Sequence, residues 1–376
     1  MAFEAGIACL DNLVNRARAT YPLGPVAASP TGTLAAPMAS VLLSSHARFL
    51  DHLTGRSHPE RPARLEAVLS GIARAGLADA LVPVEPRPAT VAELSAVHPR
   101  EHLEALEQFC LAGGGHLDAD TSASAGSWDA AVLAAGAGLD AVERLDRGEA
   151  DAAFCAVRPP GHHALANRVM GFCLLNSVAV TAATLAARGE LVLVVDYDAH
   201  HGNGTQDLFY GDERVAYVSM HQWPLYPGTG ALAEVGTGAG RGATCNFPFP
   251  AGATGDAYLS AVDEVIAPLA ESFGATWLLL SAGFDAHRAD PLTGLGLSSG
   301  DYADLTARLA ALVPAGRVIA FLEGGYDLAA LADSAAACVA ALAGERLAPE
   351  PPTSAGPGRE VVMAASLVRH HLAELG

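Results

Sequence analysis

The segment "VVDYDAHHGNG", residues 194–204, places two aspartates and two histidines directly after a run of branched apolar residues. Side chains alternate along an extended chain, so Asp196, Asp198 and His200 are predicted to share one side. Two carboxylates and an imidazole that face one point repel one another or lie unsatisfied unless a cation joins them. A divalent metal ion resolves this conflict, and Asp285, at the end of a separate apolar run, supplies a further oxygen.

The number and type of these side chains predict the kind of metal site. Asp198, His200 and Asp285 would give three protein ligands and one position open for water, which is typical of a catalytic zinc site. Oxygen-rich ligation also suits Fe(II) and Mn(II), so the ligand types leave the metal open. One alternative is a turn in which these groups only satisfy the backbone. A dinucleotide-binding turn is disfavoured, because "GNGTQD" lacks the GxGxxG spacing.

The elements that must position these residues follow from a regular alternation along the chain. Longer helix-like segments separate short apolar runs, which predicts an α/β fold with a central parallel β-sheet and helices on both faces. The predicted strands are residues 152–157, 191–196, 214–220, 276–282 and 317–323. They lead into "RPPGHHA", "DYDAHHGNG", "HQWPLYPGTG", "GFDAHRADP" and "GGYD". Ligands bind beyond the carboxyl ends of parallel strands, so these five polar segments are predicted to share one site.

Composition excludes several classes of protein. Apolar residues make up 51% of the 376 residues and charged residues 17%, which favours a large core over disorder. The net charge of −19 disfavours nucleic acid as a partner and suits cationic substrates. Every basic residue is arginine, which excludes a Walker P-loop lysine and a pyridoxal Schiff base.

The sequence also predicts the cellular location and the domain organisation of the protein. No apolar run is long enough to cross a bilayer, and the N-terminus has no basic region typical of a secretory signal. The six cysteines form no CxxC pair, so we expect reduced thiols in the cytoplasm. We expect an N-terminal extension at 1–40, a catalytic domain at 41–345, and a C-terminal linker and short helix at 346–376.

At this point a family resemblance emerges. The segments "HPERPARLEAV", "RPPGHHA", "GFCLLN", "VDYDAHHGNGTQ", "SMHQWPLYPGTG", "SAGFDAHRADP" and "EGGYD" occur in order within about residues 41–345. They resemble the zinc-dependent histone deacetylase family, in particular its bacterial and class II members. The resemblance implies the arginase/deacetylase fold, and it implies that Asp198, His200 and Asp285 bind one zinc ion.

The resemblance also implies roles for five further residues. His163 would be the general base and then the acid that protonates the leaving amine, and His162 would act mainly through its charge. Asp196 would pair with His162. Asn203, which stands where class I relatives have an aspartate, would be a weaker orienting partner of His163. Tyr326 would donate a hydrogen bond to the scissile carbonyl.

Substrate contacts are implied in the same way. Phe172 and Tyr226 match two aromatic residues that wall a narrow acyl-lysine tunnel, and Gly171 matches a residue whose carbonyl meets the substrate amide. Leu292 stands where polyamine-selective relatives can carry a glutamate, so it favours acyl-lysine. Asp120 matches, more loosely, a residue that binds the substrate backbone from a rim loop.

A monovalent cation and the overall function complete what the resemblance implies. The potassium site of the family matches Asp196, Asp198, His200, Ser219 and Met220, partly through backbone oxygens. The function implied is an enzyme that removes acetyl or other acyl groups from lysine side chains through a metal-activated water.

Other functions remain open beside this one. An acetylpolyamine deacetylase is the main alternative, and a non-catalytic acyl-lysine-binding protein is another. A binuclear ureohydrolase on the same fold would need additional metal ligands. The sequence also leaves open whether the chain forms a homo-oligomer.

Overall fold

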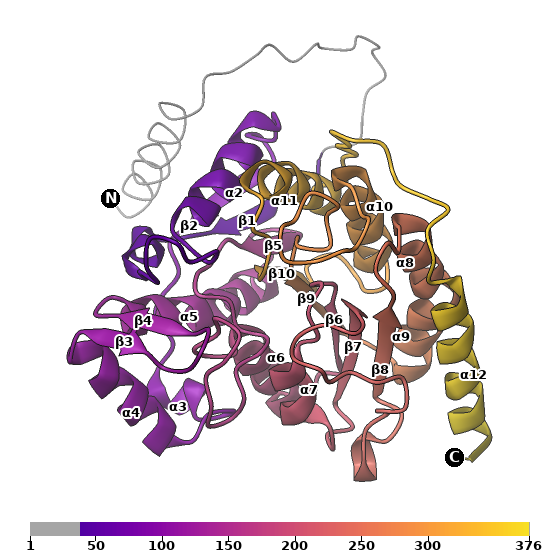
Figure 1. Ribbon diagram of the computed structural model, residues 1–376, viewed down its shortest axis with the longest axis horizontal. Coiled ribbons are helices and arrows are strands. Elements are labelled where there is room, and N and C mark those ends of the chain that lie inside the picture. The colour runs from indigo at the N-terminus through magenta and orange to yellow at the C-terminus, as the bar shows by residue number, and fades with distance from the viewer. Residues whose placement is uncertain (1–37, 376) are drawn as a thin grey trace.

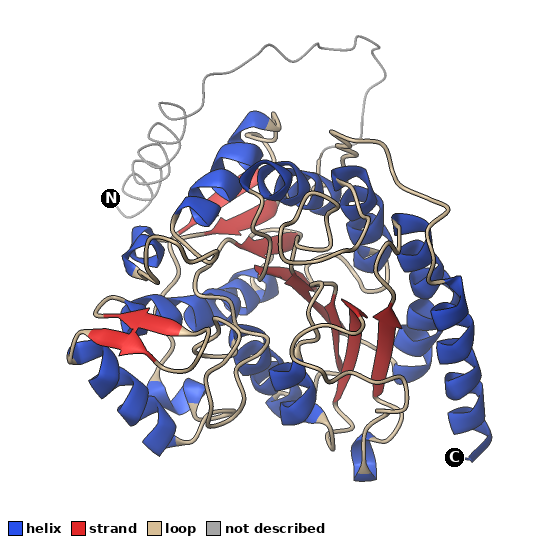
Figure 2. Ribbon diagram, in the orientation of Figure 1, coloured by secondary structure: helices blue, strands red, loops and turns tan. Residues whose placement is uncertain are grey.

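A computed structural model describes residues 38–375, and these form a central sheet covered by helices on both faces (Figure 1). Most of the predicted N-terminal extension, residues 1–37, lies outside the described residues. Figure 2 shows the strands enclosed between two groups of helices, as a buried parallel sheet requires. The predicted fold class is therefore confirmed.

The main sheet has eight parallel strands in the order β2-β1-β5-β10-β9-β6-β7-β8. Its strands are β1 (Val41–Ser44), β2 (Leu81–Val84), β5 (Ala152–Cys155), β6 (Val192–Asp196), β7 (Val215–Gln222), β8 (Thr244–Phe249), β9 (Trp277–Ala282) and β10 (Val318–Leu322). A separate antiparallel pair consists of β3 (Gly114–His116) and β4 (Ser122–Ser124).

The five strands predicted from the sequence are β5, β10, β9, β6 and β7, which lie next to one another at the centre of the sheet. Every residue of β5, β6, β9 and β10 is buried, which explains their continuous apolar runs. The sequence reading did not identify β1, β2 and β8. Two of these form the edges, and β1 and β2 are only four residues long, so their periodic signal is weak.

The helices form two layers. α2, α10 and α11 pack together on one face, and α5 packs on α6 on the other. The helices are α2 (Ala63–Arg74), α3 (Val91–Leu94), α4 (Arg100–Leu111), α5 (Ser127–Asp146), α6 (Ser177–Ala187), α7 (Asn203–Phe209), α8 (Gly255–Ala261), α9 (Ala267–Phe273), α10 (Ser299–Ala310), α11 (Leu328–Leu342) and α12 (Arg359–Leu375). Two short 3₁₀ helices are η1 (Ala47–Asp51) and η2 (Gly238–Gly240), and η3 (Val262–Ile266) is a π-helical segment between α8 and α9.

Local signals explain where the helices beside the site begin. The side chain of Asn176 accepts a hydrogen bond from the amide of Ala179 and so caps α6. Ser298 and Asp301 form a capping box at the start of α10. These caps end the loops that leave the carboxyl ends of the strands, so they limit how far those loops move.

The C-terminal residues return to the domain. The segment predicted to be a linker, 348–358, is held by hydrogen bonds that include Thr353 to Asp301 and Gly356 to Thr254. The predicted C-terminal helix is α12, which packs on β8 at the edge of the sheet (Figure 1). Within residues 38–375, no helix combines the length and the apolarity needed to span a membrane.

Candidate active site

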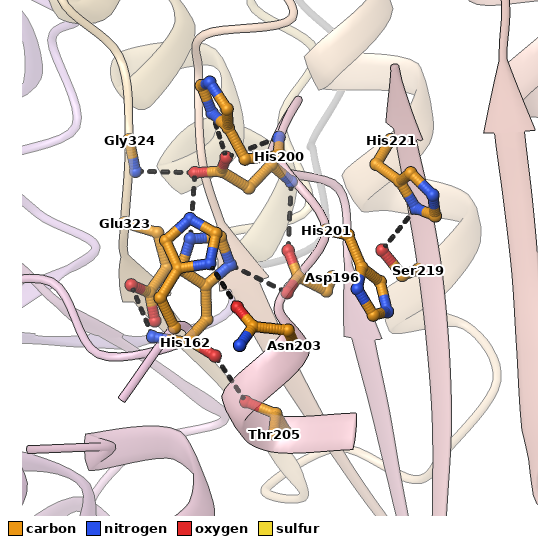
Figure 3. A network of polar contacts seen from close by, with 12 residues as sticks. His162, Asp196, His200, His201, Asn203, Thr205, Ser219, His221, Glu323 and Gly324 are labelled. Carbon is orange, nitrogen blue, oxygen red and sulfur yellow. Dashed lines mark hydrogen bonds and ion pairs between the residues drawn. The ribbon is translucent and has the colours of Figure 1, made fainter. Parts of the chain in front are cut away.

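The polar segments that follow β5, β6, β9 and β10 meet at one edge of the sheet, as predicted from the parallel arrangement. Figure 3 shows residues from the segments after β5, β6 and β10, together with Ser219 and His221 of β7. Register aligns the strands: Asp196 at the end of β6 pairs with Ser281 of β9 and with Ser219 of β7.

Asp198, His200 and Asp285 form a compact cluster. Nδ1 of His200 lies 3.2 Å from Oδ1 of Asp198 and 3.0 Å from Oδ2 of Asp285. One ligand atom from each residue lies within 4.8 Å of the others, as a shared metal ion requires. Both carboxylates are buried, and His200 is almost so.

The charge of this cluster suits a dication. Burial opposes protonation of His200, but hydrogen bonds to Asp198 and Asp285 raise its pKa to about 10. Burial and the charge of Asp198 raise the pKa of Asp285. A pocket that attracts a proton this strongly attracts a metal cation as well, so the donor set fits a zinc ion.

Backbone groups hold the two carboxylates in place. The amide of Ala199 donates to Oδ1 of Asp285 over 2.7 Å, and the amide of Gly324 donates to Oδ2 of Asp198 over 2.8 Å. A Cβ on Gly324 would overlap both carboxylates, so only glycine allows this approach. One oxygen of each carboxylate is thus held by a backbone amide, which fixes the orientation of the acid.

Asp196 is turned away from this cluster. Its Oδ2 lies 2.9 Å from Nδ1 of His162 (Figure 3). The same oxygen accepts a hydrogen bond from the hydroxyl of Tyr217. The amide of Asp198 donates to its other oxygen. The sequence predicted that Asp196, Asp198 and His200 face the same point. In the structure Asp198 and His200 face the proposed metal position, whereas Asp196 contacts His162.

His162 and His163 are adjacent but differ in their partners. Their ring centroids lie 4.0 Å apart, and Nδ1 of His163 lies 2.8 Å from Oδ1 of Asn203. An amide oxygen only accepts, so Nδ1 of His163 carries the hydrogen and Nε2 keeps a free lone pair. Asp196, by contrast, is a carboxylate that stabilises a positive charge on His162.

The same partners push the two pKa values apart. Burial opposes protonation of His162, but the charges of Asp196 and Asp198 raise its pKa well above the usual value. Burial and the neighbouring charges of His162 and His200 lower the pKa of His163 well below the usual value. One ring is therefore charged and the other is neutral, which separates an electrostatic group from a proton acceptor.

Tyr326 stands on the turn after β10. Its amide donates to Oδ2 of Asp290 over 2.7 Å, the guanidinium of Arg64 lies 4.9 Å from its ring centroid, and Phe172 packs against it edge-on. Burial raises the pKa of its hydroxyl well above the usual value, and the charges of Asp285 and Asp198 add to this against the charge of Arg64. The phenol therefore remains a hydrogen-bond donor.

Three of the residues predicted to contact substrate, Tyr226, Phe172 and Gly171, lie beside His163 or Tyr326. Tyr226 packs edge-on against His163 at 5.2 Å, and Phe172 lies between Tyr326 and His58. Gly171 has a positive φ of 57°, and a Cβ there would overlap the ring of His163. The side chains of Tyr226 and Leu292 are partly exposed.

Asp120 is engaged within the protein. Its Oδ1 accepts hydrogen bonds from the amide of Gly171 over 3.1 Å and from the hydroxyl of Thr121 over 2.7 Å. Its backbone oxygen meets Nε2 of His58. The structure therefore shows Asp120 supporting the turn at 171–172, next to the rim where a substrate contact was predicted.

The sequence reading missed three residues that support the site. Glu323, directly after β10, accepts a hydrogen bond from the amide of His162 (Figure 3) and another from the amide of Gly161. Asp290 holds the amide of Tyr326, and Arg64 donates to the backbone oxygens of Glu323 and Gly325. An acid that closes an apolar strand was an available signal for Glu323. Arg64 and Asp290 also lie within segments that carry the family resemblance, but the supporting role of Arg64 could not be read from the sequence, because its partners lie far away along the chain.

A second group of potential ligands consists of His162, Cys173 and Glu323. Its ligand atoms already serve other contacts: Glu323 accepts the two amides, and the thiol of Cys173 donates to the carbonyl of Gly171. Burial also raises the pKa of Cys173 well above the usual value, which disfavours the thiolate that a metal needs. Asp198, His200 and Asp285 remain the better metal site.

His98 leads to a prediction about stability. Its Nε2 accepts a hydrogen bond from the amide of Asn176 and its Nδ1 donates to the carbonyl of Ala166, so the fold requires the neutral ring. Burial lowers its pKa from 6.5 to about 4, so the unfolded chain binds a proton first as the pH falls. Between pH 7 and pH 5 the free energy of unfolding should therefore drop by about 2 kcal/mol relative to His98→Gln, which cannot titrate.

Urea unfolding of both proteins at the two pH values measures this difference. His371→Gln, at an exposed position of α12, is the control and should follow the wild type. Parallel pH dependence of the wild type and His98→Gln would contradict the argument.

A parallel α/β sheet with this acid–imidazole cluster beside a histidine pair is the arrangement expected of a metal-dependent hydrolase. Comparison with known proteins makes the class more specific. The histone deacetylase domain model matches residues 58–342. A probable deacetylase of Archaeoglobus fulgidus is 39% identical over 306 residues, which cover 80% of this chain and 85% of the relative.

Two further relatives agree. Histone deacetylase 15 of Arabidopsis thaliana is 39% identical over 318 residues, which cover 83% of this chain and 57% of that longer protein. The crystal structure of the HDA15 HD domain matches with a TM-score of 0.82 at 36% identity, over 89% of this chain and 97% of that one. The chain belongs to the histone deacetylase family. It is accordingly a hydrolase of the deacetylase class with the arginase/deacetylase fold.

Proposed function

We propose that the protein is a zinc-dependent lysine deacylase, which removes acetyl or other acyl groups from lysine side chains. The observation that carries the proposal is the cluster of Asp198, His200 and Asp285 beside two histidines whose pKa values are shifted in opposite directions. Membership of a family of deacetylases indicates the class of reaction, and the opposite pKa shifts of His162 and His163 indicate which groups carry charge and move protons.

The metal position follows from the donor set. Asp198, His200 and Asp285 would hold the zinc ion, and a bound zinc ion supplies a Lewis acid that polarises the acyl carbonyl and acidifies water. Only the neutral imidazole of His200 has a lone pair for the metal, so the zinc ion competes with a proton for this nitrogen. Asp196, Asp198, His200, Ser219 and Met220 are proposed to hold potassium, supported by the register that sets Ser219 beside Asp196.

The protein's own side chains then move the proton and bind the oxygen. Nε2 of His163 accepts a proton from the attacking water and later delivers it to the departing lysine amine. The positive charge of His162, held by Asp196, stabilises the negative charge that develops on the acyl group. The hydroxyl of Tyr326 donates a hydrogen bond to the acyl oxygen. Each role uses the protonation state described above.

The residues proposed to contact the substrate suit an extended alkyl chain. Phe172 and Tyr226 would form the walls around it, and the carbonyl of Gly171 would accept a hydrogen bond from the substrate amide. Leu292 puts an apolar side chain at the position where a carboxylate would attract a second amine. These features favour acyl-lysine over an acetylated polyamine.

The five described cysteines are buried free thiols, which supports the proposed cytoplasmic location.

A direct assay of two substrates tests the proposal. The purified zinc-loaded protein should deacetylate an acetyl-lysine peptide at least about tenfold faster than N-acetylputrescine, in kcat/KM, because each 1.4 kcal/mol of lost contact gives a factor of ten. A chelator should abolish both reactions, and added zinc should restore them. Turnover of the polyamine alone would replace lysine with polyamines as the substrate class.

Leu292→Glu provides the matched variant in the same assay. A carboxylate at this rim position attracts a distal ammonium group, so the preference should move towards N-acetylputrescine while the metal site is unchanged. If the ratio of kcat/KM for the two substrates is unchanged, Leu292 does not determine substrate specificity.

A further inference from the structure

The C-terminal tail contacts the loop that follows β9. We define the ligand loop as residues 285–292, which contains Asp285, Asp290 and Leu292. Oε2 of Glu350 lies 2.6 Å from Nε2 of His287, and Oε1 of Glu350 contacts the guanidinium of Arg288. Glu350 lies beyond residues 58–342, which match the family domain. The contact therefore joins a segment outside that match to the loop that carries a proposed zinc ligand.

The hydrogen-bond pattern fixes the orientation of His287. Its Nδ1 accepts from the amide of Ala289 over 3.1 Å, so the hydrogen of the neutral ring is on Nε2 and is donated to Glu350. The imidazole is 4% exposed, so water cannot readily replace the carboxylate. The amide of Ser299, at the start of α10, also donates to Oε2 of Glu350 and anchors it.

His287 in turn supports both functional ends of the ligand loop. Its carbonyl accepts from the amide of Asp290, and Asp290 accepts from the amide of Tyr326 over 2.7 Å. Asp285 lies two residues before His287, and its carboxylate is aligned by the amide of Ala199. Because the ring and the carbonyl belong to the same residue, displacement of His287 as a whole would move Asp285 and Asp290 relative to Tyr326.

We propose that Glu350 is a positioning residue for deacylation: through His287 it fixes the ligand loop and hence the spacing between Asp285 and Tyr326. The proposal rests on the proposed function. A shift of about 1 Å in such a constellation is enough to cost up to a hundredfold in rate. The tail thus acts on the reaction without touching the substrate.

Three variants test this role in the zinc-loaded, full-length protein. Glu350→Ala should lower kcat about tenfold and leave KM within about twofold, because loop misplacement affects the reacting geometry more than binding. Glu350→Gln should keep more than half of the wild-type kcat, because its amide oxygen still accepts from Nε2 of His287. Arg346→Ala breaks the ion pair between the tail and Asp304 of α10, which includes no residue of the ligand loop, and should keep wild-type kcat.

Amide hydrogen exchange provides a readout that is independent of turnover. The amides of Asp290 and Tyr326 should exchange faster in Glu350→Ala than in Arg346→Ala, and Glu350→Gln should resemble the wild type. Equal kcat and equal exchange in the two alanine variants would overturn the proposal and leave Glu350 with a role in stability alone. If the wild type fails to deacylate lysine peptides, the proposed function fails, and the exchange comparison still decides whether Glu350 fixes the loop.

Discussion

Asp285→Ala is expected to yield a folded protein that no longer retains zinc and has lost almost all deacetylase activity. The substitution leaves Asp198 and His200 as a two-ligand site and removes the acceptor of the amide of Ala199. Loss of the metal's stabilisation of the acyl oxygen and water should lower kcat/KM by roughly 10⁴-fold, which corresponds to about 5–6 kcal/mol in the barrier.

Metal content and thermal unfolding measure this outcome without reference to activity. Zinc should raise the Tm of the wild type and leave that of Asp285→Ala unchanged, because only binding to the folded state shifts the Tm. Without zinc the variant need not be less stable, since burial and the charge of Asp198 disfavour the ionised Asp285. Asp263→Ala, which removes an exposed partner of Arg308, is the control and should retain zinc and activity. One zinc per chain and normal turnover in Asp285→Ala would refute the assigned ligand set.

Tyr326→Phe is expected to retain zinc and to lose turnover by about 10²–10³-fold in kcat, the usual cost of removing one oxyanion donor. The phenylalanine preserves the contacts with Phe172 and Arg64 and deletes only the hydroxyl. Because the lost hydrogen bond strengthens as charge develops on the acyl oxygen, KM should change far less than kcat.

Tyr302 offers a matched control for this experiment. Its hydroxyl is buried and has no hydrogen-bond partner among the described residues, and its ring packs on Phe284, next to the ligand loop. Tyr302→Phe therefore removes the same atom from a neighbouring buried tyrosine and should keep wild-type kcat. Equal activities of Tyr326→Phe and the wild type would remove Tyr326 from the mechanism.

Much of this protein was predictable from its sequence because the decisive signals are local. Continuous apolar runs identify the five central strands, and a strand's carboxyl end is where its polar segment begins. The parallel arrangement then brings segments from distant parts of the sequence to one edge. The cluster of Asp198, His200 and Asp285 follows from that rule together with the chemistry of carboxylates and imidazole, before any side-chain contact is known.

Tertiary structure decided what depends on distance and burial. The resemblance implied that Asp196 pairs with His162 and Asn203 with His163, and both contacts are present in the structure. Only the structure set the two histidine pKa values in opposite directions, because each shift depends on partners from other strands and on the surrounding desolvation. The contact between Glu350 and His287 also depends on the tertiary structure. Sixty-three residues separate the pair, and no periodicity or motif connects a tail glutamate to the loop beside β9.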